Sequence, residues 1–149
     1  MSYSFLPPAD ELQIRNLIAR YAFCADSGDG AGYADLFVED GSFTHKTAPP
    51  DAPCGIDQTG ETVHGRAALT EMVAGLHQRF HYKIRHQMTD ILVQPGESED
   101  RAKVNFRALA SDWTKEGDTQ FIFVYYDGEC ARVDGLWKIA WLDVYSLTY

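Results

Sequence analysis

Apolar residues recur at helical spacing along three stretches of the chain, residues 9–25, 30–38 and 65–80. In the third stretch, the residues that share one face are Leu69, Met72, Val73, Leu76 and Phe80. This spacing predicts three amphipathic helices, each with one face on a common core. The first helix is expected to end at residues 27–30, because Ser-Gly-Asp-Gly is a typical turn sequence.

Elsewhere apolar and polar residues alternate, which is typical of β-strands. A short strand is predicted over residues 42–46, where Phe43 and His45 share a face. Further strands are predicted over residues 82–93, 102–113, 119–127, 129–133 and 136–148. Long strands joined by short turns predict a twisted antiparallel meander in the second half of the chain.

Two segments depart from these simple patterns. Residues 47–61 fit neither period and contain three prolines and two glycines, so we predict a mobile flap there. Residues 121–126 are apolar on both faces, which predicts a sheet that is covered on both sides. Helices can cover one side and a second subunit the other, so we also predict a homo-oligomer, a dimer or a trimer.

The composition favours a single domain, residues 1–149, with a sizeable core, because 45% of the residues are hydrophobic and 13% are aromatic. A formal net charge of -9 without clusters of Lys and Arg argues against nucleic acid or an anionic membrane as a partner. No apolar run is long enough for a membrane-spanning helix, and residues 1–10 do not resemble a secretion signal. Three cysteines without metal-ligand spacing predict a cytoplasmic location.

Two residues of the first helix are candidates for chemistry. Tyr21 places a phenol on the apolar face of the helix. Asp26 follows where the helix must stop, so its carboxylate meets the negative end of the helix dipole and needs a compensating partner. The alternative is that Asp26 is a solvated turn residue.

His86 is the third candidate, because alternation places it on one face of a strand with Ile84 and Met88. A buried imidazole needs partners for its ring nitrogens, or it loses about 1–3 kcal/mol of stability. An acidic partner is expected. From the pattern alone, His86 is either a satisfied core histidine or a general acid or base.

Other motifs give weaker signals. The glycine-rich residues 27–32 follow a helix rather than a strand, which favours a turn over a phosphate loop. His77 and His81 have the spacing of two metal ligands on a helix, but no third ligand is suggested nearby. No Gly-x-Ser-x-Gly motif is present, and none of the cysteines has an obvious activating partner. We therefore expect no metal, no nucleotide and no other cofactor.

Several segments resemble the SnoaL-like branch of the NTF2-like superfamily. They are Leu-Ile-Ala-Arg-Tyr at 17–21, Asp-Ser-Gly-Asp at 26–29, Asp-Leu-Phe-Val-Glu-Asp-Gly at 35–41, His-Gly-Arg at 64–66 and Arg-His at 85–86. The resemblance implies an α+β fold of the cystatin-like kind, a cone-shaped barrel in which three N-terminal helices pack in the concave face of a curved, mainly antiparallel sheet. The superfamily includes scytalone dehydratase, bile acid 7-alpha-dehydratase, hexachlorocyclohexane dehydrochlorinase, ketosteroid isomerase and SnoaL polyketide cyclases, so the fold alone does not fix the chemistry.

The resemblance also assigns roles to the candidate residues. In the dehydratases and the dehydrochlorinase, an Asp at the end of the first helix pairs with a strand His, and these positions match Asp26 and His86. Tyr21 matches a Tyr of the bile acid dehydratases and the oxyanion donor of the steroid isomerases. His45 falls where the isomerases carry their carboxylate base. It is therefore a second acid or base candidate, or a residue of the pocket wall. Ala25 stands where scytalone dehydratase has a Tyr.

The resemblance thus implies a cofactor-independent lyase of the dehydratase type, which acts on a small cyclic, largely apolar hydroxy-carbonyl compound through an Asp-His dyad. The expected partner is a small hydrophobic or aromatic molecule. The residues expected to line its pocket are Phe43, Met88, Phe106, Tyr125 and Trp141. The alternatives are an isomerase or polyketide cyclase on the same scaffold, and a non-catalytic member that binds a hydrophobic ligand or a partner subunit.

Overall fold

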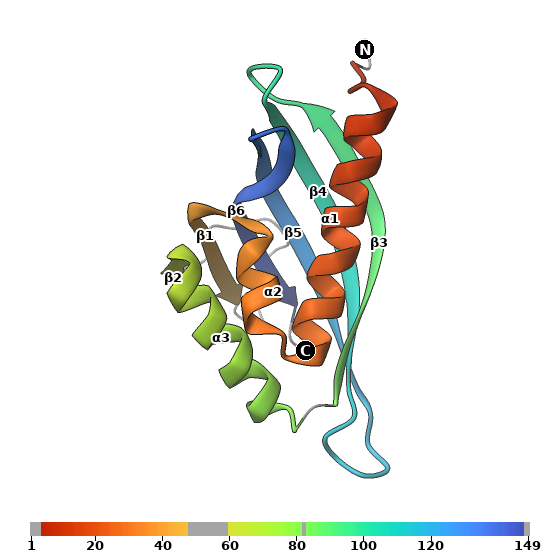
Figure 1. Cartoon of the computed structure of the whole chain (residues 1–149). Helices are drawn as coiled ribbons and strands as arrows, with labels where there is room; N and C mark the ends of the chain where they lie inside the picture. Colours follow the sequence, from red (N-terminus) through yellow and green to blue (C-terminus); the bar gives the residue numbers. More distant parts are fainter. Residues whose placement is uncertain (1–3, 48–59, 82, 148–149) are drawn as a thin grey trace.

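The computed structural model describes residues 4–47, 60–81 and 83–147, in which three helices lie against one curved sheet of six strands (Figure 1). The helices are α1 (Pro8–Ser27), α2 (Gly30–Asp35) and α3 (Gly65–Arg79). The strands are β1 (Phe37–Thr47), β2 (Gly60–His64), β3 (Ile84–Pro95), β4 (Arg101–Asp112), β5 (Gln120–Val133) and β6 (Leu136–Leu147). The implied α+β fold is confirmed.

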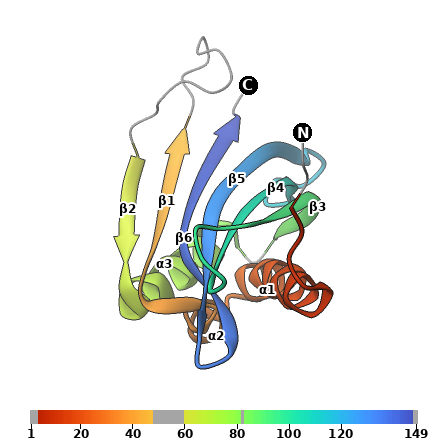
Figure 2. The ribbon, with the colours of Figure 1, turned by 90° about the horizontal axis from the view of Figure 1, so that it is seen from above.

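The strands follow the order β2-β1-β6-β5-β4-β3, so β2 and β3 form the two edges of the sheet. Neighbouring strands are antiparallel except β1 and β6, which are parallel. Figure 2 shows the sheet curving around the helices, which occupy its concave side. The mainly antiparallel sheet is thus confirmed, and the parallel pair places the first strand beside the last one.

The predicted helices are present with shifted ends. α1 continues to Ser27, two residues beyond the predicted end. α2 ends at Asp35 rather than at residue 38, because β1 already begins at Phe37. The predicted helix over residues 65–80 is α3.

The strand predictions differ more in length than in place. The short strand predicted over residues 42–46 is the second half of β1, and the two strands predicted over 119–127 and 129–133 are one continuous strand, β5. The predicted flap begins at the last residue of β1 and ends inside β2. Its residues 48–59 lie outside the described residues.

The core lies between α1 and the concave face of the sheet. From α1, the buried residues include Ile14, Leu17, Ile18 and Tyr21, which recur on one face of the helix. From β4, small side chains such as Ala108 and Ala110 face the same core. Small inward side chains leave space between the sheet and the helices, and part of that space forms a cavity bordered by Ala110.

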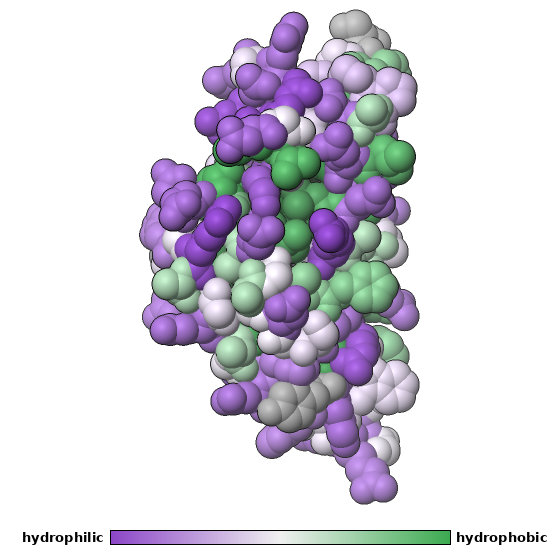
Figure 3. All heavy atoms as spheres, viewed as in Figure 1, coloured by the Kyte–Doolittle hydropathy of each residue, from purple (hydrophilic) through white to green (hydrophobic). Residues whose placement is uncertain are grey.

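The surface around the helices is mostly hydrophilic. Figure 3 shows hydrophilic side chains over most of this face, with hydrophobic side chains gathered between α1 and its neighbours. None of the helices in the described part of the chain is long and apolar enough to cross a membrane.

A buried carboxylate, that of Asp10, joins the N-terminal end of α1 to neighbouring residues of β5 and β6. Asp10 Oδ1 accepts hydrogen bonds from Trp137 Nε1 at 2.9 Å and from the Arg132 guanidinium at 3.1 Å. Arg132 also pairs with Asp100 at 3.0 Å. Because Asp10 is buried, its loss would leave the indole N–H of Trp137 without this acceptor.

We predict that Asp10→Ala lowers the free energy of unfolding by about 2–4 kcal/mol, because it removes a buried, charge-assisted pair of hydrogen bonds. Urea unfolding of the variant and of the unmodified protein measures this difference in the free energy of unfolding. Glu11→Ala is the matched control, since Glu11 lies in the same helical turn but pairs with Arg15 on the surface, a contact worth about 0.3–0.5 kcal/mol. Equal losses for the two variants would contradict the role assigned to Asp10.

The convex face of the sheet exposes large apolar side chains. Phe121 is 61% exposed and Phe123 is 37% exposed, and Leu109 is the cross-strand partner of Phe123. The helices lie on the concave side of the sheet (Figure 2), toward which the buried Val124 and Tyr126 of β5 point, so the alternate residues Phe121 and Phe123 point away from the helices. Exposed aromatic residues grouped on one face are typical of an interaction surface.

A homo-oligomer that buries this convex face therefore stays a prediction. We expect sedimentation velocity at micromolar concentration to show a dimer or a trimer, and Phe121→Glu to shift it to a monomer by placing a charge in the interface. Leu12→Glu is the control, because Leu12 is equally exposed, at 60%, but belongs to α1 on the other side of the sheet. A stable monomer of the unmodified protein would overturn the prediction.

Candidate active site

A cavity of about 520 Å³ lies between the helices and the concave face of the sheet. Most of its wall is apolar, and the apolar residues come from all parts of the fold: Ala25, Phe43, Val63, Met72, Val73, Leu76, Phe80, Ile84, Ala110, Ile122, Val124 and Val144. The polar side chains in the wall are Tyr21, Tyr33, His45, Glu61, Arg79, His86, Tyr126 and Ser146. An apolar cavity with a few convergent polar groups is typical of a small-molecule site.

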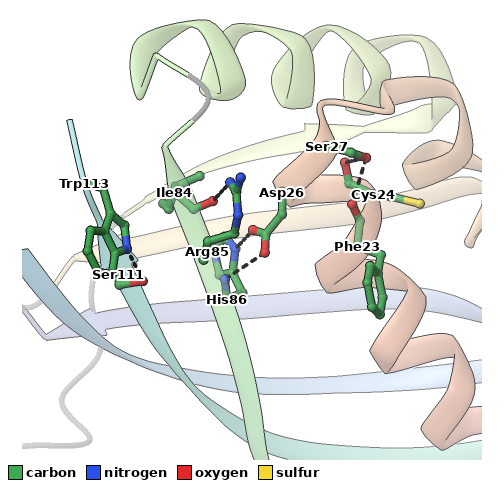
Figure 4. A network of polar contacts seen from close by, with 9 residues as sticks. All are labelled: Phe23, Cys24, Asp26, Ser27, Ile84, Arg85, His86, Ser111 and Trp113. Atoms are coloured by element: carbon green, nitrogen blue, oxygen red, sulfur yellow. Dashed lines mark hydrogen bonds and ion pairs between the residues drawn. The ribbon is translucent and has the colours of Figure 1, made fainter.

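His86 borders this cavity, and Asp26, which is not itself one of the lining residues, contacts His86 (Figure 4). The distance from Asp26 Oδ1 to His86 Nδ1 is 2.6 Å, and Asp26 Oδ2 accepts a 2.9 Å hydrogen bond from the backbone N–H of His86. The side chains are only 16% and 10% exposed, respectively. One carboxylate therefore accepts hydrogen bonds from both the main chain and the ring of the same residue.

The local sequence explains how these two groups meet. α1 terminates at Gly28, which has φ 71° and adopts the left-handed conformation that glycine tolerates without strain. Asp26 thus lies in the last helical turn, where its charge is unfavourable unless it is compensated. His86 lies on β3, an edge strand whose outward N–H groups have no neighbouring strand to bind.

The contact fixes the tautomer of the neutral imidazole. When Nδ1 carries the proton and donates it to Asp26, the lone pair of the ring is on Nε2. His86 borders the cavity, so Nε2 is the ring nitrogen left for a bound molecule. This arrangement suits a general base.

Three tyrosines form a cluster in the buried part of the cavity wall. The ring centroids of Tyr21 and Tyr33 are 5.0 Å apart, and those of Tyr21 and Tyr126 are 5.7 Å apart. Burial, and next the proximity of Tyr33, raises the pKa of Tyr21 well above its ordinary value of 10.0. Burial is also the main cause that raises the pKa of Tyr33 and of Tyr126. All three phenols therefore stay protonated at neutral pH and can donate hydrogen bonds.

His45 lies elsewhere in the cavity wall, on β1. Its Nε2 is 2.7 Å from Ser146 Oγ on β6, a contact made possible by the parallel pairing of these two strands. Partial burial, and next the positive charge of Arg79, lowers the pKa of His45 from 6.5. The imidazole of His45 is therefore neutral at neutral pH.

The structure places the predicted site residues in different positions. Tyr21, His45 and His86 border the cavity together, as does Phe43. Phe106 faces the core but lies behind Tyr126, on which its ring stacks at a centroid distance of 4.4 Å.

The other three predicted pocket residues do not border the cavity. Met88 packs against the core farther along β3. Tyr125 lies on the convex face, since its neighbours Val124 and Tyr126 point inward and its hydroxyl accepts a hydrogen bond from Arg107.

Trp141 also departs from the prediction, because a register irregularity in β6 reverses the alternation before it. Cys130 pairs with Ile139 and Glu129 pairs with Trp141, so residue 140 is bypassed. Ile139 and Leu142 are buried, whereas Trp141 is 36% exposed. This bulge places Trp141 on the outer face of the sheet.

Several cavity residues were not among the sequence candidates. Tyr33 and Tyr126 were visible only as members of apolar stretches, in the helix predicted over residues 30–38 and the strand predicted over residues 119–127. Ser146 and Arg79 gave no signal at all. These residues border the cavity only because segments far apart in the chain come together. His45 and Ser146, for example, are in contact although 101 positions separate them.

No group of three or more His, Cys, Asp or Glu side chains among the described residues could hold a metal ion. The spacing of His77 and His81 does not give helical geometry, because α3 ends at Arg79 and His81 has a positive φ of 47°.

A family profile described as a SnoaL-like domain matches residues 8–143. The chain belongs to the SnoaL-like family. No curated protein matches the sequence.

Solved structures with the same fold extend the comparison. An NTF2-like protein with a cystatin-like fold from Novosphingobium aromaticivorans has a TM-score of 0.75 and 24% identity, covering 92% of this chain and 81% of that one. A candidate scytalone dehydratase from the same species has a TM-score of 0.72 and 22% identity, covering 94% and 85%. The hexachlorocyclohexane dehydrochlorinase LinA-type3 from Novosphingobium barchaimii has a TM-score of 0.74 and 21% identity, covering 93% and 86%. At these identities the likeness establishes the shared fold.

We predict that Arg79→Gln raises the pKa of His45, because the substitution removes the nearby positive charge that disfavours the imidazolium. The pKa should stay below 6.5, since partial burial, the larger cause, remains. An NMR titration of the His45 ring protons measures the midpoint. Arg20→Gln, a change on the exposed side of α1, should leave it unchanged. An unaltered midpoint in Arg79→Gln would show that the guanidinium does not act on His45.

Proposed function

We propose that this SnoaL-like protein is a cofactor-independent lyase, which eliminates water from a small cyclic, largely apolar hydroxy-carbonyl compound. The observation that carries the proposal is the pairing of Asp26 with His86 at the wall of an apolar cavity. A protein that only bound a hydrophobic ligand would have no need of an imidazole held in one tautomer by a buried carboxylate.

In the first step, His86 Nε2 removes the proton from the carbon beside the carbonyl. The C–H electron pair moves toward the carbonyl and forms an enolate, and Nε2 carries the proton. The carboxylate of Asp26, 2.6 Å from Nδ1, stabilises the imidazolium that results. The neutral form of the His86 ring is needed for this step, because an imidazolium has no lone pair with which to accept the proton.

In the second step, the enolate expels the hydroxyl group from the neighbouring carbon. The C–O bond breaks, the double bond forms, and the imidazolium returns its proton to the departing hydroxide to give water. Atoms and charges balance without any other reactant. The bond from the backbone N–H of His86 holds Asp26 in place while the ring gains and loses its proton.

Tyr21 is the proposed donor to the enolate oxygen. Its phenol stays protonated in the buried end of the cavity, and Tyr33 and Tyr126 interact with its hydroxyl and orient it. A preorganised donor in a site of low dielectric stabilises developing negative charge more than water does. His45 remains a second acid or base candidate in this proposal, because it shares the cavity.

The partner and the location follow from the same features. The apolar wall favours a hydrophobic or aromatic ring compound, and no cofactor is required for the two proton transfers. Cys24 and Cys130 are free thiols, which supports a reducing cytoplasm as the setting.

We predict that His86→Ala and Asp26→Ala each remove most turnover, about 100-fold or more, and that the double variant is little worse than either one. Residues that act as one unit are not additive in their losses. The assay follows the ultraviolet absorbance of the conjugated enone formed from a panel of cyclic β-hydroxy ketones. Tyr21→Phe should lose about 10- to 1,000-fold, since one oxyanion donor is removed and the proton path remains.

Met88→Ala is the matched control for the assay, because Met88 is on the same strand and face as His86 but does not border the cavity. Near-normal turnover by a folded His86→Ala protein would end the elimination mechanism. Proton exchange into the ketones without loss of water would instead favour an isomerase, whose base returns the proton to carbon.

A further inference from the structure

The polar groups of the cavity are divided between a buried end and an exposed end. Tyr21, Tyr33 and Tyr126 are at most 4% exposed and mark the buried end. The cavity residues classed as exposed are His45, Glu61 and Arg79, which mark its mouth. The mouth is therefore charged and polar, whereas the middle of the cavity is apolar.

Arg79 is the cation at this mouth, and its charge has no carboxylate partner among the described residues. Several other basic side chains of the described residues do pair with a carboxylate, such as Lys46 with Asp143 at 2.9 Å and Arg101 with Glu129 at 2.8 Å. For Arg79 the contact found is with the ring of Phe80, itself a cavity residue, at 5.9 Å. The guanidinium is thus free to donate to a ligand.

His45 and Ser146 supply neutral groups beside this cation. Their 2.7 Å contact engages Nε2 of the ring and fixes the position of the serine hydroxyl, which is buried. Arg79, His45 and Ser146 all border the cavity, so their side chains face the same space, and the positive charge of Arg79 acts on the imidazole of His45. A guanidinium beside a hydroxyl and an imidazole can form several charge-assisted hydrogen bonds to one anionic oxygen pair.

We infer that Arg79, His45 and Ser146 form a second binding subsite, which holds the carboxylate of a ring-containing ligand at the mouth while the apolar part fills the cavity. The inference deepens the proposed function and rests on it, because the proposed function is what places the reacting carbon at His86. Glu61 at the same mouth opposes an anion, so it sets the affinity of the subsite.

The overall charge of the protein makes this inference testable with simple probes. At a formal net charge of -9, the long-range field repels anions, so any preference for an anionic probe must come from a local site. Cinnamate and its neutral amide, cinnamamide, have the same ring and shape and differ at the carboxylate. Isothermal titration calorimetry gives the dissociation constant of each.

We expect cinnamate to bind about three- to tenfold more tightly than cinnamamide, a modest preference because the ion pair is partly exposed. Arg79→Gln should abolish this preference, because it removes the cation. Arg79→Lys should retain part of it. Glu61→Gln should increase the preference, since it removes the opposing charge. Arg20→Gln changes the net charge equally but lies away from the cavity, and it should leave the preference unchanged.

Tighter binding of the amide, or an equal preference in Arg79→Gln and the unmodified protein, would overturn the subsite. A folding defect in Arg79→Gln would not hide the answer, because Arg79→Lys and Glu61→Gln predict opposite shifts. The binding measurement needs no turnover. A carboxylate preference without dehydration of any hydroxy ketone would therefore contradict the proposed function alone, and dehydration without the preference would contradict the subsite alone.

Discussion

The contact between the Asp26 carboxylate and His86 is the interaction around which the cavity is arranged. It places a charge at the unfavourable end of α1 and compensates that charge with two donors from one residue of β3. Because β3 is an edge strand, the N–H of His86 is available to a side chain from the helix layer. The same contact therefore closes one side of the helix–sheet interface and orients the imidazole.

The curvature of the sheet gives this contact its surroundings. Inward side chains on β4 such as Ala108 and Ala110 are small, whereas Phe106 is large and its ring stacks on Tyr126. The stacked pair fills the core beside the cavity, whereas Ala110 leaves the space beside His86 open. A wall that is apolar in the middle and polar at two ends excludes most water while it orients an elongated ligand. The phenols at the buried end are hydrogen-bond donors in a medium of low dielectric, where such donors interact strongly with negative charge.

The sequence predicted those parts of the fold and site that depend on local pattern. Alternation placed His86 on the same face of its strand as Ile84, and it placed Phe43 and His45 together on one face of theirs. The helical period placed Tyr21 on the buried face of α1. It did not predict Trp141, because a single bypassed residue in β6 reverses the alternation, and a bulge leaves no clear mark in the residue types. Tyr125 failed for another reason, since a strand that is apolar on both faces gives no sign of which face is inside.

Contacts between residues far apart in the chain could not be predicted from the local sequence pattern. Ser146 and Arg79 acquire a role only because β6 pairs in parallel with β1 and because α3 ends at the mouth of the cavity. The two histidines of the cavity show the consequence, since the same side chain is placed beside a carboxylate in one case and beside a guanidinium in the other. Asp26 accepts a hydrogen bond from Nδ1 of the His86 ring, whereas the positive charge of Arg79 disfavours a protonated ring at His45. One histidine thereby presents Nε2 to the cavity as a hydrogen-bond acceptor, while the other stays neutral at the cavity wall.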